Sequence, residues 1–123
     1  MGNWFLRTSM IFLMLGVGLG MYMGPREDFT QVPVHVHLNL VGGVWMFLAG
    51  LFYNTHPHIS RKAIAVHYGL SAVGMPLFAI GLWGAQIHTP WYLPLVISGA
   101  SLSALGLLVF AVLVFIGTGK KPA

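Results

Sequence analysis

The sequence contains no cysteine and only two acidic residues among its 123 positions. The lack of cysteine excludes disulfides, thiolate nucleophiles and cysteine-type zinc sites. Two acids leave no material for a paired-carboxylate active site. Charged residues make up 7% of the chain, against roughly 25% in soluble domains, while 57% of the residues are hydrophobic. This composition does not fit a soluble cytoplasmic enzyme.

The excess of basic over acidic residues, which gives a formal net charge of +4, is also unusual. The basic residues stand singly or in pairs at the ends of apolar runs, and they form no stripe that could follow a nucleic acid. We therefore expect no nucleic-acid partner and interpret the positive charge as a signal of orientation in a membrane.

Four apolar runs are long enough to cross a bilayer, which takes about 20 helical residues. Segments rich in turn-forming residues separate them, and such short loops force neighbouring helices to be antiparallel. The sequence therefore predicts a single all-α integral membrane domain over residues 1–123, a four-transmembrane-helix antiparallel bundle. The expected spans are Trp4–Met23, Val34–Tyr53, Ala63–Gly84 and Tyr92–Ile116.

Most basic residues fall on one side of such a bundle. The opposite side holds the first loop, in which Arg26 is outnumbered by Glu27 and Asp28. Because lysine and arginine are retained on the cytoplasmic side, we expect both termini to be cytoplasmic (N-in/C-in). The residues on the expected cytoplasmic side are Arg7, Arg61, Lys62, Lys120 and Lys121.

Small residues recur in two spans at the spacing that lets helices approach closely. They indicate close packing either within the bundle or along a seam between copies, and the sequence leaves both open. In the third span, Pro76 is expected to kink the helix. The two rows are Gly16, Gly20 and Gly24, and Gly99, Ser103 and Gly106.

Six histidines are unusual in so weakly charged a chain. His35 and His37 open the second span, and residues two apart on a helix point about 200° apart. This pair is therefore expected to serve two different faces. His67 lies about one turn into the third span, where a ligand and a hydrogen-bonded structural histidine are both open. His56 and His58 stand in a loop, where we expect solvated side chains.

The two faces of the second span differ in polarity. The face of His35 carries polar and small groups and must contact protein or a bound group, because lipid would leave Asn39 without hydrogen bonds. The face of His37 is apolar and runs through Val41, Val44 and Leu48. The complete stripe on the first face is His35, Asn39, Gly42, Met46, Gly50 and Tyr53.

The depth of each histidine limits which of them can share one iron atom. In straight helices His37 and His67 are separated by roughly 20 Å along the bundle, at 1.5 Å per residue. One heme iron cannot take both as ligands. His88, at the outer end of the third span, has a depth compatible with His35 and His37.

The end of the first span adds soft ligands at the same depth, namely Met21 and Met23. Thioethers with imidazole suit Cu(I), whereas two imidazoles, or an imidazole and a thioether, suit heme iron. A copper site would use these methionines with His35 and His37. Arg26 beside the same surface is a candidate partner for heme propionates.

The run 33–42 contains the pattern H-x-H-x-N-L-x-G, and the segments 20–24 and 28–29 precede it. This first half of the chain resembles small four-helix bacterial membrane proteins related to subunit I of heme-copper oxidases and nitric oxide reductases. In the large oxidase subunits, histidines near the outer ends of spans hold heme.

The resemblance implies a multi-pass protein of the bacterial inner membrane that binds heme b. It casts His35 and His37 as heme ligands, with a second axial ligand from His88, His67 or a neighbouring copy. We therefore favour a b-type heme-binding protein that transfers electrons or serves as an accessory subunit of a respiratory complex, rather than a stand-alone enzyme.

Two other functions remain open, a copper-binding membrane protein and a purely structural respiratory subunit whose histidines only form hydrogen bonds. The expected partners are membrane lipid and either further copies of the chain or a larger complex. Self-association is expected because four helices are too few to enclose a heme unless copies share walls.

Overall fold

The computed structural model describes residues 1–119, which are helical along most of their length. Four helical stretches are long and apolar enough to cross a membrane, and each predicted span lies inside one of them. The second stretch is continuous from Val32 to Thr55 although its backbone changes type. The elements are α1 (Gly2–Arg26), α2 (Val32–His37), the π-helix η1 (Leu38–Trp45), α3 (Met46–Thr55), α4 (Arg61–Gln86) and α5 (Tyr92–Gly117).

Local signals in the sequence explain where the helices begin and end. Ser60 caps α4, since its side chain accepts a hydrogen bond from the backbone N–H of Ala63 at 3.4 Å. Glu27 and His88 adopt left-handed backbone angles, with φ of 51° and 56°, directly beyond or near the ends of α1 and α4. Pro76 lies inside α4, and the helix continues past it to Gln86.

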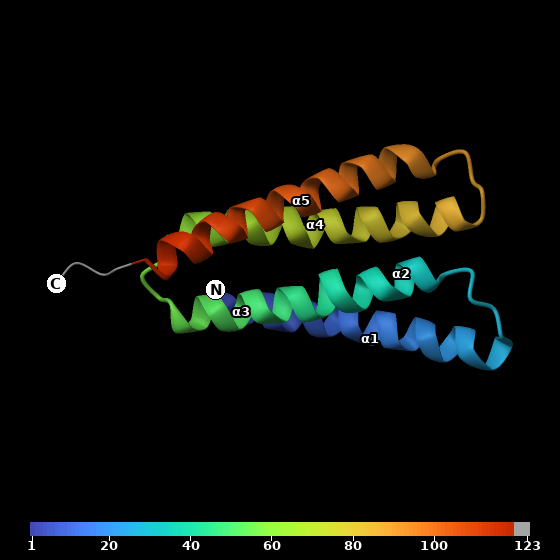
Figure 1. Ribbon diagram of the computed structural model, residues 1–123, viewed down its shortest axis with the longest axis horizontal. Coiled ribbons are helices and arrows are strands. Elements are labelled where there is room, and N and C mark those ends of the chain that lie inside the picture. The colour runs from blue at the N-terminus through green and yellow to red at the C-terminus, as the bar shows by residue number, and fades with distance from the viewer. Residues whose placement is uncertain (120–123) are drawn as a thin grey trace.

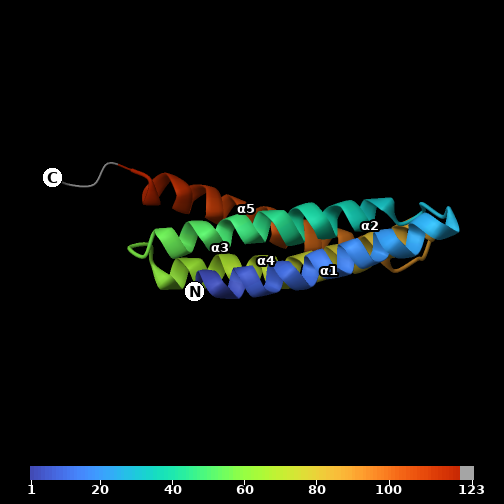
Figure 2. The same cartoon turned by 90° about the horizontal axis from the view of Figure 1, so that it is seen from below.

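The helices form two antiparallel hairpins that lie side by side (Figures 1 and 2). One hairpin consists of α1 with the α2–η1–α3 stretch, and the other consists of α4 with α5. The start of α1, the α3–α4 connection and the end of α5 lie at one end of the bundle, which we call the terminal end. The α1–α2 and α4–α5 connections lie at the opposite end, the loop end.

The first glycine row lies at a helix contact within the chain. A Cβ atom added at Gly20 would stand 2.7 Å from Cε1 of His35, and one added at Gly16 would collide with Oδ1 of Asn39. Only Gly24 of this row faces open space, with nothing within 4 Å. Gly16 and Gly20 therefore bring α1 close to the second helical stretch and are not available as a seam for another copy.

The second small-residue row joins α5 to α4. A Cβ at Gly99 would collide with the backbone of Phe78, and one at Gly106 would stand 2.7 Å from Oγ of Ser71. These close approaches make the α4–α5 pair a tightly packed hairpin. Each row thus accounts for helix packing inside one hairpin.

The predicted polar stripe of the second helical stretch is mostly buried, whereas part of the predicted apolar face is exposed. The stripe faces protein as expected, with Met46 and Tyr53 only 1% and 3% exposed. Val44 and Leu48, predicted to share a face with His37, are instead 46% and 53% exposed. Both lie in or just beyond the π-helix η1, whose turn is wider than that of an α-helix.

The hairpins meet at the terminal end through a cluster of aromatic rings. His67 is fully buried there and stacks on Phe110 with ring centroids 5.1 Å apart. Phe5 of α1 packs on the same imidazole at 4.8 Å. The cluster comprises Phe5, Tyr53, His67, Tyr68 and Phe110.

Candidate functional site

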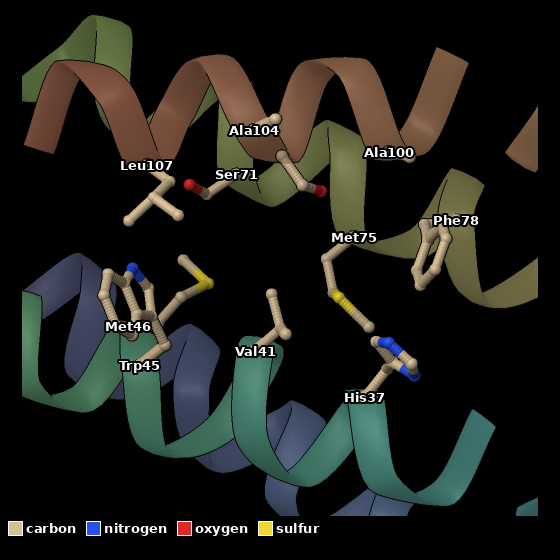
Figure 3. A pocket seen from close by; sticks show the side chains of 11 residues that line it. His37, Val41, Trp45, Met46, Ser71, Met75, Phe78, Ala100, Ala104 and Leu107 are labelled. Carbon is tan, nitrogen blue, oxygen red and sulfur yellow. The ribbon is translucent and has the colours of Figure 1, made fainter. Parts of the chain in front are cut away.

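A cavity of about 420 Å³ lies between the hairpins, and its size is in the range of small-molecule sites. Its walls come from the second helical stretch on one side and from α4 and α5 on the other (Figure 3). None of the lining side chains is an acid, a lysine or an arginine. They are His37, Val41, Trp45, Met46, Ser71, Met75, Phe78, Ala100, Ser103, Ala104 and Leu107.

His37 is the one titratable side chain on this cavity. Its Nδ1 atom lies 2.6 Å from the carbonyl oxygen of Pro33. Because a carbonyl can only accept, Nδ1 donates, and the neutral ring keeps a lone pair on Nε2. The edge of the ring meets Phe78 of α4 at a centroid distance of 4.9 Å. A histidine whose Nδ1–H is held by a backbone carbonyl is the usual arrangement of a metal-ligating imidazole.

Two methionines bring thioethers to the same cavity. Met75 reaches from α4 toward the His37 ring on the facing wall (Figure 3), and Met46 lies on the side of η1 and α3. Each is 1% exposed. The sequence analysis missed both as candidate ligands, because methionine is common in apolar helices and only the tertiary structure places these two on a cavity.

The wall away from His37 carries hydroxyl groups. Ser71 and Ser103 both line the cavity, and Oγ of Ser103 is buried without a hydrogen-bond partner within residues 1–119. Phe78, which touches His37, is seven residues beyond Ser71 on α4, or about 10 Å along the helix. The cavity is therefore largely apolar, with the imidazole of His37 and the two serine hydroxyls as polar groups on its walls.

His35 does not reach this cavity. Its Nδ1 donates to the carbonyl oxygen of Gly16 at 2.6 Å, and the Asn39 amide lies 3.4 Å from its Nε2. The imidazole thus lies between α1 and α2, while His37 faces α4, so the pair serves two faces as predicted. Within one chain the two histidines do not face a common ligand position.

His67 is buried in the aromatic cluster at the terminal end. Its Nδ1 is 2.7 Å from the Tyr53 hydroxyl, and its Nε2 has no partner among the described residues. His67 lies one turn before Ser71 but is not part of the cavity lining. On α4, His67 lies about three turns before Phe78, the residue that contacts His37. This separation agrees with the predicted difference in depth between His37 and His67.

The candidate residues at the loop end do not converge. His88 is exposed beyond α4, and the Arg26 guanidinium lies over the Tyr22 ring at 3.9 Å. Met21 is 72% exposed, whereas Met23 is 4% exposed, because residues two apart on a helix point in nearly opposite directions.

The described part of the chain contains no group of three histidines, cysteines or acids able to hold a metal ion. Within one chain Met21 and Met23 point to nearly opposite sides of α1. In the α3–α4 connection, His56 stacks on Phe52, and Nε2 of His58 donates to the carbonyl oxygen of Gly117 at 3.2 Å. These two histidines have structural contacts of their own.

The central cavity combines an apolar space with an imidazole whose lone pair is available, which are two features of heme sites. The thioether of Met75 adds a second donor of a type that cytochromes use.

Comparison with known proteins found no family model, no curated protein and no solved structure that matches this chain.

Proposed function

We propose that this chain is a multi-pass membrane protein that binds heme b in the central cavity, with His37 as an axial ligand. The observation that carries the proposal is the imidazole of His37 on a largely apolar cavity, with its Nδ1–H held by the Pro33 carbonyl. The role is electron transfer, either alone or as an accessory subunit of a respiratory complex.

Each cavity residue has a definite part in this proposal. The Pro33 carbonyl fixes the orientation and tautomer of the His37 ring, so that Nε2 is the ligand atom. Met75, on the facing wall, would supply a thioether as the second donor to the group. The apolar walls exclude water from the group. Bound heme would supply a one-electron carrier, whose potential depends on its axial ligands and on the polarity around it.

The proposal also covers the orientation of the chain and the membrane in which it lies. The distribution of basic residues favours cytoplasmic termini in a bacterial inner membrane, which puts His37 nearer the outer face than His67. Association with further copies belongs to the proposal as well, because four helices are too few to enclose a heme unless copies share walls.

A second candidate function rests on the unpartnered hydroxyl of Ser103. A quinol-type molecule has an apolar ring with a polar oxygen at each end. One quinol hydroxyl could donate to Nε2 of His37, and the hydroxyl of Ser103 could donate to the other oxygen. This candidate uses the same cavity without heme.

The deciding experiment is a reduced-minus-oxidised absorption spectrum of detergent-purified protein, with a pyridine assay for heme type. Heme binding predicts a Soret band that falls at least about tenfold in His37→Gly, because a coordinate bond to iron is lost. Added imidazole should restore that band by entering the space that the side chain leaves. Met75→Leu should keep heme but convert its spectrum toward high spin.

Two histidine variants serve as matched controls. His56→Ala leaves the cavity unchanged and should keep the full spectrum. His35→Ala removes the hydrogen bond to Gly16 and should reduce stability while leaving heme content intact. A preparation without heme that releases a quinone on solvent extraction would favour the second candidate. A His37→Gly protein with unchanged bands would exclude His37 as a ligand.

A further inference from the structure

A second cavity system lies on the other side of the junction between the hairpins, between α1 and α4. It begins as an apolar groove of about 760 Å³ that includes Phe12, Ala79 and Trp91 in its walls. A smaller recess of about 180 Å³ adjoins it at the loop end. Leu19 and Trp83 line both, so the groove and the recess share a wall. The walls of this system do not include His37.

The recess contains a buried polar atom without a partner. Gln31 is 6% exposed, and its Nε2 donates to the backbone carbonyl of Trp83 at 3.4 Å. This hydrogen bond fixes the orientation of the amide, so that Oε1 is left unpartnered among the described residues. An amide oxygen can only accept. The recess is therefore suited to a ligand group that donates hydrogen bonds.

Charges of both signs stand at this recess. The carboxylate of Asp28 lines it and accepts hydrogen bonds from the backbone N–H and the hydroxyl of Thr30 at 3.1 and 2.6 Å. These hydrogen bonds hold the pKa of Asp28 below its ordinary value, so the group is ionised at neutral pH. Tyr22 lines the recess too, and the Arg26 guanidinium lies over its ring.

We infer that this groove and recess bind one zwitterionic phospholipid whose headgroup carries a primary ammonium. An acyl chain fills the apolar groove. The ammonium donates to Oε1 of Gln31 and to the carboxylate of Asp28, and the phosphate pairs with Arg26 at the rim. The groove alone would accept any acyl chain, but the unpartnered amide oxygen and the two charges select the headgroup.

The test uses the full chain in detergent, exchanged into nanodiscs of defined composition and examined by native mass spectrometry. The three probe lipids are phosphatidylethanolamine, phosphatidylcholine and phosphatidylglycerol with identical acyl chains. Phosphatidylcholine keeps both charges but has no N–H to donate, and phosphatidylglycerol has no cation. We expect one tightly retained phosphatidylethanolamine per chain, with at least about tenfold preference over either of the other lipids.

Variants then locate the lipid. Gln31→Leu and Asp28→Asn should each abolish most of the headgroup preference, whereas Glu27→Gln changes a neighbouring acid outside the recess and should keep it. Ala79→Phe fills the groove and should release the acyl chain of any headgroup. Equal retention of the three lipids by the unmodified chain would overturn the proposal, as would a preference unchanged in both recess variants. Heme content is read on the same samples, so failure here is distinguishable from failure of the proposed function.

Discussion

The three histidines within the helical stretches differ in what their second ring nitrogen meets. In His37, Nδ1 is held by Pro33 and Nε2 is the remaining acceptor on a cavity wall. In His35, Nε2 lies 3.4 Å from the amide nitrogen of Asn39. In His67 it is buried without a described partner. These local differences give three residues of one type an acceptor nitrogen on a cavity wall, a contact between α1 and α2, and a buried hydrogen bond.

The Tyr53–His67 hydrogen bond can be tested by deleting one hydroxyl. Tyr53→Phe leaves both nitrogens of a fully buried imidazole unpartnered. We expect the free energy of unfolding to fall by about 1 kcal/mol, within the range found for hydrogen bonds between membrane helices. The measurement is unfolding in a titration with denaturing detergent. Tyr92→Phe, at the start of α5, is the control, and equal stability of the two variants would show that the hydroxyl contributes nothing.

At the scale of the elements, η1 shows how a glycine pair permits an unusual backbone. Cβ atoms at Gly42 and Gly43 would stand 2.7 Å from Phe12 and 2.5 Å from Leu13, side chains of α1. The missing side chains let η1 lie against α1 while its wider turn moves Trp45 and Met46 onto the central cavity. The π-helix therefore shapes the candidate site.

The two sides of α1 should respond differently to the same substitution. Gly20→Ile places a branched side chain against His35, whereas Gly18→Ile extends into open space. We expect the first variant to lose about 1 to 3 kcal/mol of stability through overpacking and the second to lose much less. Thermal unfolding and native mass spectrometry together give stability and copy number. A change in mass without loss of stability in Gly20→Ile would instead assign this face to a contact between copies.

The whole molecule consists of two hairpins that are closed at the terminal end and separated elsewhere by cavities. The buried rings around His67 join the hairpins at one end. The central cavity lies on one side of the junction, and the groove between α1 and α4 lies on the other. The two cavities have different lining residues, so the two proposed ligands would not compete for the same space.

The orientation of the whole molecule is testable with reporter fusions. A reporter after Lys121 should behave as cytoplasmic, and one inserted beside Glu27 should behave as external, because the basic residues are concentrated at the terminal end. Activity of a periplasmic reporter after Lys121 would reverse the topology. It would also move His37 toward the cytoplasmic face.

Much of the architecture could be predicted from the sequence because its causes are local. The length and hydropathy of each apolar run determine a helix that can cross a membrane. Turn residues separate the runs, and the 3.6-residue period sends His35 and His37 to different faces whatever surrounds them. The polar stripe ending at Tyr53 had to be buried for the same kind of reason, since lipid cannot satisfy Asn39.

Only the tertiary structure decided which faces meet and what they enclose. The glycine rows fit packing within a chain and packing between chains equally well until Gly16 and Gly20 were found against the second helical stretch. Met75 became a candidate ligand because α4 brings it opposite His37. The π-helix η1 lies close to α1 at Gly42 and Gly43, which the periodicity of the second span does not indicate. Cavities are properties of the space between elements, and no periodicity within one helix contains that information.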